Sequence, residues 1–151
     1  MRERTRLLGV DYGTVRIGLA ITDPDRILAS PLETYTRRDK EADADHFREL
    51  VEEERVGEIV MGLPVHLSGR KGQKAIETED FAKELEAITG LKVTFYDERF
   101  TTVEAEQFLL DAGLTNKRRK ARRDQLAAQI LLQSYLDAGC PSDPEIGPLD
   151  G

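Results

Sequence analysis

Three acidic sites in the sequence could together hold divalent metal ions. Asp11 ends a short apolar run, the pair Asp97-Glu98 ends another, and Asp124 lies near the start of the predicted last helix. Burying a carboxylate is costly unless it is paired or binds a cation. Mg²⁺ and Mn²⁺ prefer carboxylate oxygens, and two such ions can activate water and stabilise the leaving oxygen in phosphodiester cleavage. The three sites therefore suggest a metal-dependent hydrolytic centre.

Each acid also has an ordinary structural interpretation. Asp11 could accept hydrogen bonds from backbone N–H groups of a turn, and Asp97-Glu98 could form a strand-end ion pair with Arg99. Asp124 could be an acid favoured at a helix N-terminus, or an ion-pair partner of Lys120. Adjacent strand residues point to opposite faces, so only one of the two neighbouring acids can share a face with Asp11. Periodicity does not select between them.

A run of cations directly precedes Asp124. Six of the eight residues from Asn116 to Arg123 are Lys or Arg, in a chain with 22 Lys and Arg, 29 Asp and Glu, and a net charge of −7. A merely solvated helix start would favour acids, because cations oppose the helix dipole there. The net acidity argues against binding nucleic acid through bulk charge. We instead predict local binding of nucleic-acid phosphates by Arg99, Lys117, Arg118, Arg119, Lys120, Arg122 and Arg123.

The elements that must position these residues alternate in an α/β order. Apolar or alternating runs predict strands over residues 7–10, 17–22, 27–35, 59–63 and 91–96, with an edge or a bulge at Pro31. Three successive strands followed by βα units predict a five-stranded mixed sheet, with three antiparallel strands, two parallel ones and helices on both faces. Ligand sites of such sheets lie beyond the carboxyl ends of the parallel strands, where Asp11 and Asp97-Glu98 fall.

Helical spacing predicts four helices. The first spans 39–55 and is closed by Gly57, the second ends at Gly90, and a third opens with a capping box at Thr101 and ends at Gly113. The last has a packing side made of Leu126, Ala127, Ile130, Leu131 and Ser134.

Composition and length favour one soluble domain. With 151 residues, 39% of them hydrophobic, we predict a single domain over 1–139 and a flexible Pro/Gly-rich tail over 140–151. One cysteine, Cys140, excludes an internal disulfide and a cysteine zinc site. His46 and His66 are interpreted as surface or hydrogen-bonding histidines. The absence of a signal-peptide or membrane-helix pattern predicts a cytoplasmic protein with no membrane partner.

Four motifs, in this order and spacing, closely resemble the YqgF/RuvX family. They are Val10–Gly18 (VDYGTVRIG), Gly62–Pro64 (GLP), Asp97–Thr102 (DERFTT) and Asp124–Ala128 (DQLAA). The resemblance implies a ribonuclease H-like fold and a nuclease that matures the 5′ end of pre-16S rRNA in ribosome biogenesis. An earlier interpretation made such proteins Holliday junction resolvases. Many relatives carry Asp-Gly in the loop after GLP, whereas this chain has Ser68-Gly69.

Carried over by position, the resemblance assigns the catalytic, metal-binding acids to Asp11, Glu98 and Asp124. It assigns supporting roles to Gly13, Thr101 and Thr102. The expected cofactors are two Mg²⁺ or Mn²⁺ ions, with Asp11 bridging both and the other two acids completing one coordination sphere each.

The expected partner is precursor ribosomal RNA or a pre-ribosomal particle, bound by a monomer or weak homodimer. Alternatives are a Holliday junction resolvase, which would need a dimer to cut two strands symmetrically, and a non-catalytic RNA-binding assembly factor. The Asp11–Thr14 segment also matches the phosphate loop of actin-like and sugar-kinase ATPases. Those enzymes need two such domains, and the chain is long enough for one.

Overall fold

The chain forms a five-stranded sheet in a computed structural model, which describes residues 5–63, 72–97 and 116–141 and, over 116–122, the backbone alone. The strands are β1 (Arg6–Asp11), β2 (Arg16–Thr22), β3 (Ala29–Thr36), β4 (Val56–Leu63) and β5 (Val93–Asp97). Their spatial order is β3-β2-β1-β4-β5. The first three pair antiparallel, and β4 and β5 add in parallel, which confirms the predicted mixed sheet.

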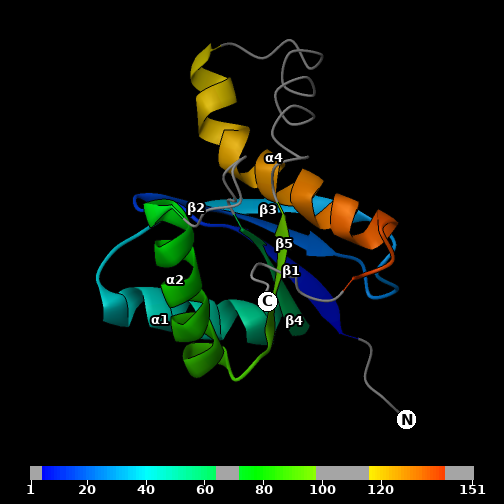
Figure 1. The fold of residues 1–151 in the computed structure, drawn as a ribbon, viewed down its shortest axis with the longest axis horizontal. Coiled ribbons are helices and arrows are strands. Elements are labelled where there is room, and N and C mark those ends of the chain that lie inside the picture. The colour runs from blue at the N-terminus through cyan, green and yellow to red at the C-terminus, as the bar shows by residue number, and fades with distance from the viewer. Residues whose placement is uncertain (1–4, 64–71, 98–115, 142–151) are drawn as a thin grey trace.

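Helices cover both faces of this sheet (Figure 1). The structure describes helices α1 (Lys40–Glu53), α2 (Gln73–Thr89) and α4 (Asn116–Asp137). Val10 of β1 packs in one apolar cluster with Phe47 of α1 and Leu85 of α2. Leu7 of the same strand packs with Leu132 of α4 in a second cluster. Because strand side chains alternate between faces, odd-numbered β1 residues point toward α4 and even-numbered ones toward α1 and α2.

Local sequence accounts for most element boundaries. Asp39 caps α1, since its carboxylate accepts a 2.8 Å hydrogen bond from the Ala42 backbone N–H. Gly90 ends α2 in the left-handed region at φ 73°, as predicted. The predicted irregularity at Pro31 is also confirmed, because the β2–β3 register shifts between Leu19 and Ala20, and β3 is an edge strand.

Several predicted boundaries were wrong. The strands predicted to begin at residues 59 and 91 begin at Val56 and Val93. Gly57 does not close α1: the chain reverses at Arg55, which takes φ 53°, and Gly57 already lies in β4. The Arg55 carbonyl accepts a hydrogen bond from Arg6 N, so the reversal is tied to β1. The third strand begins at Ala29 rather than at Ile27, because the Asp23 carboxylate holds the Ile27 and Leu28 amides in a turn.

The predicted packing side of the last helix was partly wrong. Leu126 and Leu131 are buried as predicted, but Ala127, Ile130 and Ser134 are only half-buried. Among the described side chains of α4, over residues 123–137, the others that are buried are Ala128, Leu132 and Tyr135. Helical spacing alone fits both the predicted and the observed set of buried residues. The rotation of α4 is fixed by its contact with β1, where Gly9 has no side chain and leaves room for Leu132.

His46 lies on α1, where its ring contacts β3. The imidazole of His46 lies 2.8 Å from the Glu33 carboxylate and stacks on Tyr35, so the hydrogen-bonding interpretation of His46 is confirmed. His66, the helix predicted over 101–113 and residues 142–151 of the tail lie outside the described residues. Within the described ranges, no helix is both long and apolar enough to span a membrane.

A buried carboxylate joins the end of β3 to the start of α1. Asp43 accepts a 2.6 Å hydrogen bond from the Tyr35 hydroxyl and a 2.8 Å bond from Arg38 N, and it pairs with Arg37 at 3.5 Å. Burial of this carboxyl acts to raise its pKa. The hydrogen bonds and the Arg37 charge outweigh that effect and hold the pKa of Asp43 below its ordinary value of 3.8.

Asp43→Asn is expected to lower the free energy of unfolding at neutral pH by about 1.5–3 kcal/mol, because the bonds to a charged acceptor are lost. A lowered folded-state pKa means that the Asp43 contribution is present above pH 3.8 and is lost as the pH falls through the folded value. Acidification should therefore destabilise the wild type more than the variant. Urea unfolding near pH 7 and near pH 3 measures both effects, and Asp45→Asn, an exposed acid on the same helix, is the control.

Candidate active site

Asp11 lies at the carboxyl end of β1, on the sheet face that α4 covers. Gly9, two residues earlier, lies so close to α4 that an added Cβ would be 3.0 Å from the Leu132 Cβ. Residues two apart on a strand share a face, so Asp11 also points toward α4. Across the antiparallel pair, Asp11 is opposite Gly18 of β2.

Asp124 meets the sheet at this same position. A Cβ at Gly18 would overlap the backbone carbonyl of Asp124, so α4 approaches β2 as closely as glycine allows. The Asp124 carboxylate pairs with Arg16 of β2, with 3.1 Å between Oδ2 and Nε. Gly18 is the cross-strand partner of Asp11. Asp11 and Asp124 therefore lie beside each other at the carboxyl end of β1, on the sheet face that α4 covers. The structure thus brings together two of the three predicted acidic sites, from opposite ends of the sequence.

The third acidic site is the pair Asp97-Glu98, and the register of β5 shows on which sheet face the first of these two acids lies. Tyr96 packs toward α4, with its ring centroid 5.8 Å from that of Tyr135. Phe95 belongs to the α1 and α2 face, and strand alternation places Asp97 on that face with it. Asp97 is therefore excluded from the face that carries Asp11. Glu98, Arg99, Thr101 and Thr102 lie outside the described residues.

The loop after Asp11 is held tightly. Gly13 permits a turn in which any Cβ would overlap the Arg16 carbonyl. Tyr12 is buried against Phe81 of α2, with ring centroids 5.0 Å apart. Arg37, just beyond β3, donates from its backbone N to Val15 O at 2.9 Å and from its guanidinium to the Tyr12 hydroxyl at 3.1 Å. Arg37 thus fixes the loop that leads away from the candidate catalytic carboxylate.

Arg16 and Arg37 are site residues that the sequence analysis did not single out. Arg16 stands within the quoted VDYGTVRIG motif, but its partner Asp124 is 108 residues away. Arg37 stands beside Arg38 in a polar segment whose pattern matches any solvated strand end. Spacing along the sequence contains no signal for either contact.

The predicted basic run occupies the first two turns of α4. Lys117, Arg118, Arg119, Lys120 and Arg122 are helical, while their side chains lie outside the described part of the structure. Arg123 is exposed, directly before Asp124. Asp124, predicted near the start of this helix, therefore follows about two helical turns of mostly basic residues.

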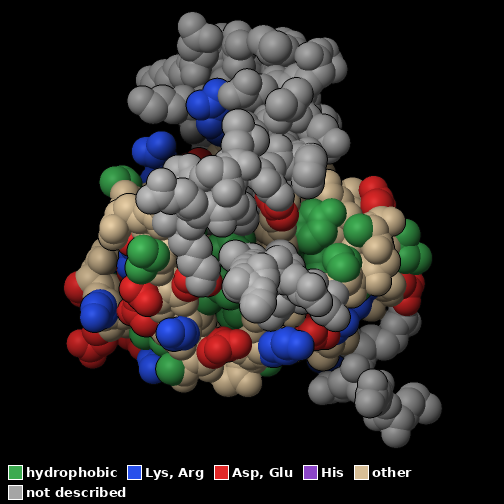
Figure 2. Space-filling model, in the orientation of Figure 1, with side chains coloured by type: hydrophobic (Ala, Val, Ile, Leu, Met, Phe, Trp, Pro, Cys, Tyr) green, Lys and Arg blue, Asp and Glu red, His purple; other side chains and the backbone are tan. Residues whose placement is uncertain are grey.

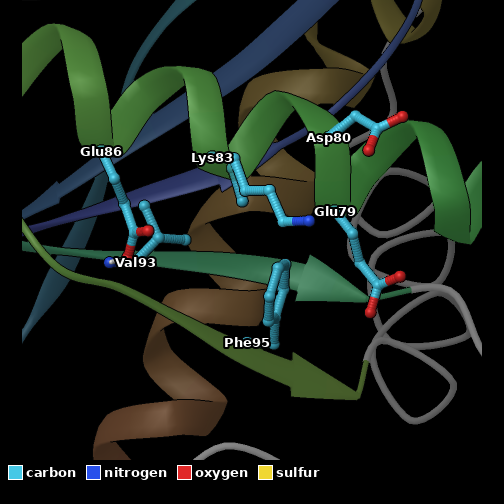
Figure 3. A pocket seen from close by; sticks show the side chains of 7 residues that line it. Glu79, Asp80, Lys83, Glu86, Val93 and Phe95 are labelled. Carbon is cyan, nitrogen blue, oxygen red and sulfur yellow. Dashed lines mark hydrogen bonds between the residues drawn. The ribbon is translucent and has the colours of Figure 1, made fainter.

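The α1 and α2 side of the molecule offers little attraction for a polyanion. Figure 2 shows acidic and basic side chains interspersed over the part of its view where these helices lie. A pocket of about 390 Å³ between α2 and β5 is lined by Glu79, Asp80, Lys83, Glu86 and apolar neighbours (Figure 3). Three carboxylates beside one ammonium would repel a phosphodiester chain.

The donor chemistry of the acid pair fits a hard divalent cation. Asp11 and Asp124 supply carboxylate oxygens, the ligands that Mg²⁺ and Mn²⁺ prefer. Over residues 5–63, 72–97 and 116–141, no group of three or more His, Cys, Asp and Glu side chains is placed to hold a metal ion. The described pair can therefore provide part of a coordination sphere.

Comparison with known proteins identifies the family. The sequence profile of RuvX, described as Holliday junction resolvase, matches residues 5–138. The chain belongs to the RuvX family. A relative from Rhodopirellula baltica, named "Putative pre-16S rRNA nuclease", is 49% identical over 133 residues, which cover 88% of this chain and 77% of the relative. A relative of the same name from Moorella thermoacetica is 45% identical, covering 87% of this chain and 94% of the relative.

Solved structures place the RuvX-family chain in a wider fold group. Thermus thermophilus RuvC in complex with a Holliday junction substrate matches with a TM-score of 0.58 at 14% identity, over 91% of this chain and 98% of RuvC. The fowlpox virus resolvase in complex with Holliday junction DNA matches with a TM-score of 0.57 at 13% identity, over 91% of this chain and all of the resolvase chain. These likenesses concern the fold, and they confirm the predicted ribonuclease H-like architecture.

Proposed function

We propose that this protein is a metal-dependent nuclease that hydrolyses phosphodiester bonds in precursor 16S rRNA and so matures its 5′ end. The observation that carries the proposal is that Asp11 and Asp124 meet at the carboxyl end of β1, where α4 packs against Gly18 of β2. The names of the 40–49% identical relatives supply the substrate class. Such a substrate implies work in the cytoplasm.

The proposed roles follow the three acids of the family motifs. Asp11, Glu98 and Asp124 would hold two Mg²⁺ or Mn²⁺ ions, which supply an activated water and stabilisation of the leaving 3′ oxygen when bound. The Arg37 contacts fix the loop after Asp11, and the glycine contact fixes Asp124. The Lys117–Arg123 run and Arg99 would bind backbone phosphates, while Thr101 and Thr102 support the acids.

Glu98→Gln is expected to lower the cleavage rate by about 100-fold or more, whereas Asp97→Asn changes it less than about threefold. The reason is that the Asp97 side chain belongs to the face opposite Asp11, so only its neighbour can serve the acid pair. Single-turnover cleavage of a labelled RNA measures both variants. A large loss in Asp97→Asn with a normal rate in Glu98→Gln would reverse the assignment.

The proposal as a whole is tested by giving the purified protein two labelled substrates in Mg²⁺ or Mn²⁺. One is a pre-16S rRNA leader and the other a four-way DNA junction, with Asp11→Asn as the control protein. Cleavage of the RNA that is lost in the variant supports the proposed function. Cleavage of neither substrate, also in the presence of pre-ribosomal particles, would favour a non-catalytic assembly factor.

Junction resolution is the second candidate. This candidate is favoured by the description of the matching family, which names Holliday junction resolvase. A resolvase must cut two strands symmetrically and would therefore act as a dimer, whereas the maturation nuclease needs only one acid site. Symmetric junction cutting, together with a dimer in sedimentation analysis, would replace the first proposal by the second.

A further inference from the structure

Arg16 joins the candidate metal site as an ion-pair partner. It begins β2, and its Nε lies 3.1 Å from Oδ2 of Asp124. Residues two apart on a strand share a face, so Arg16 lies on the same side of the sheet as Gly18, the cross-strand partner of Asp11. The contact therefore places a guanidinium directly beside the acid pair.

Stabilisation of the fold is a weak explanation for this ion pair. The Arg16 side chain is 42% exposed and that of Asp124 24% exposed, and ion pairs this open contribute little to stability. The close packing of α4 on β2 already comes from the Gly18 contact and from the buried cluster around Leu132. The ion pair affects the charge of the site more than the stability of the fold, because Arg16 neutralises the Asp124 carboxylate that a metal ion would otherwise bind.

A metal ion and the Arg16 guanidinium compete for the same carboxylate. Both are cations that bind oxygen, and like charges brought together at the acid pair repel each other. A bound metal ion must therefore weaken the Arg16–Asp124 pair. A displaced Arg16 guanidinium would remain at the edge of the site, where a backbone phosphate of the substrate offers an alternative partner.

We propose that Arg16 is a positioning residue that exchanges partners: it pairs with Asp124 in the metal-free protein and with a substrate phosphate once metal is bound. The proposal rests on the proposed nuclease function and deepens it. Two consequences follow. Arg16 lowers the affinity of the site for the metal, and it couples metal binding to RNA binding, each strengthening the other by the same factor.

The first test is Mn²⁺ binding, followed by electron paramagnetic resonance of the free ion, which requires no cleavage. Arg16→Gln is expected to bind Mn²⁺ at least about fivefold more tightly than wild type, because competition and repulsion are both removed. Arg16→Lys keeps the charge and should stay within about twofold of wild type. Arg48→Gln is the matched control, since Arg48 pairs with Asp45 on α1, which packs on the opposite face.

The second test is the coupling between metal and RNA. Affinity for a fluorescently labelled pre-16S leader is measured in EDTA and in Ca²⁺, with intact RNA verified on a gel. Wild-type protein should gain affinity with the ion, and Arg16→Gln should gain less, by at least about threefold. An equal gain in both proteins would overturn the exchange of partners.

The outcomes separate this inference from the proposed function. Equal Mn²⁺ affinity in wild type and Arg16→Gln, with loss of binding in Asp124→Asn, would overturn the role of Arg16 and leave the metal site intact. Mn²⁺ binding that is absent from wild type would remove the metal site, and both proposals with it. Circular dichroism and thermal melting of each variant verify that it is folded.

Discussion

Asp11→Asn is expected to reduce RNA cleavage by at least about 1000-fold while shifting the melting temperature by only a few degrees. The loss of one charged metal ligand removes several kcal/mol of transition-state stabilisation, and about 4 kcal/mol corresponds to 1000-fold in rate. The stability effect is small because asparagine has the same shape and Asp11 is partly exposed at the end of β1.

The measurement is single-turnover cleavage at saturating protein, with Mn²⁺ affinity and thermal melting determined on the same preparations. Asp97→Asn is the matched control, because this acid also ends a parallel strand but belongs to the other face. A rate for Asp11→Asn within tenfold of wild type would contradict the assignment of Asp11 to the catalytic centre.

Gly18→Ala is expected to lower the cleavage rate by about 100-fold or more and the free energy of unfolding by about 1–3 kcal/mol. A methyl group at residue 18 overlaps the backbone of Asp124, so β2 and α4 must separate. The movement displaces Asp124 relative to Asp11, and a misplacement of about 1 Å can reduce a rate about 100-fold. Cleavage assays and urea unfolding measure the two effects.

Gly9→Ala provides the control for helix displacement. Its added Cβ would meet Leu132 Cβ at 3.0 Å and the Ala128 carbonyl at 3.2 Å, further along α4 than Asp124. This variant should lose stability but keep the acid pair, so its rate per folded molecule should fall less than about tenfold. Equal losses of rate in the two variants would show that general loosening of α4, rather than the position of Asp124, controls activity.

The sheet was predictable from the sequence because its signals are local. The apolar run before Asp11, the alternation over residues 17–22 and the stop at Gly90 each act within a few residues. Short connections then leave few ways to arrange three consecutive strands and two βα units. The acid that ends β1 was predictable for the same reason, since its strand and its turn are both visible in the sequence.

The contacts that assemble the site were not predictable, because they are not local. Pairing of Arg16 with Asp124 depends on the rotation and height of α4 against β2, which the Gly18 contact fixes. The choice between Asp97 and Glu98 depends on the register of β5, and a shift of one residue would reverse it. The same rotation decides which residues of α4 are buried.

The attachment of α4 has a consequence for the newly made protein. Gln129 and Gln133 bond the backbone of Ala29 and Ile27 over sequence separations of 100 and 106 residues, and Arg16 meets Asp124 over 108. At about 5–20 residues per second, ribosomes need roughly 5–20 s to extend the chain from β2 to Asp124. Throughout that interval, Asp124 is missing from the nascent chain, and the apolar surface of Leu7, Ala20 and Val60 has no α4 to cover it. Asp11 and Asp124 can therefore come together only after α4 has been synthesised, whereas the apolar cluster between the sheet, α1 and α2 contains no residue of α4 and can form earlier.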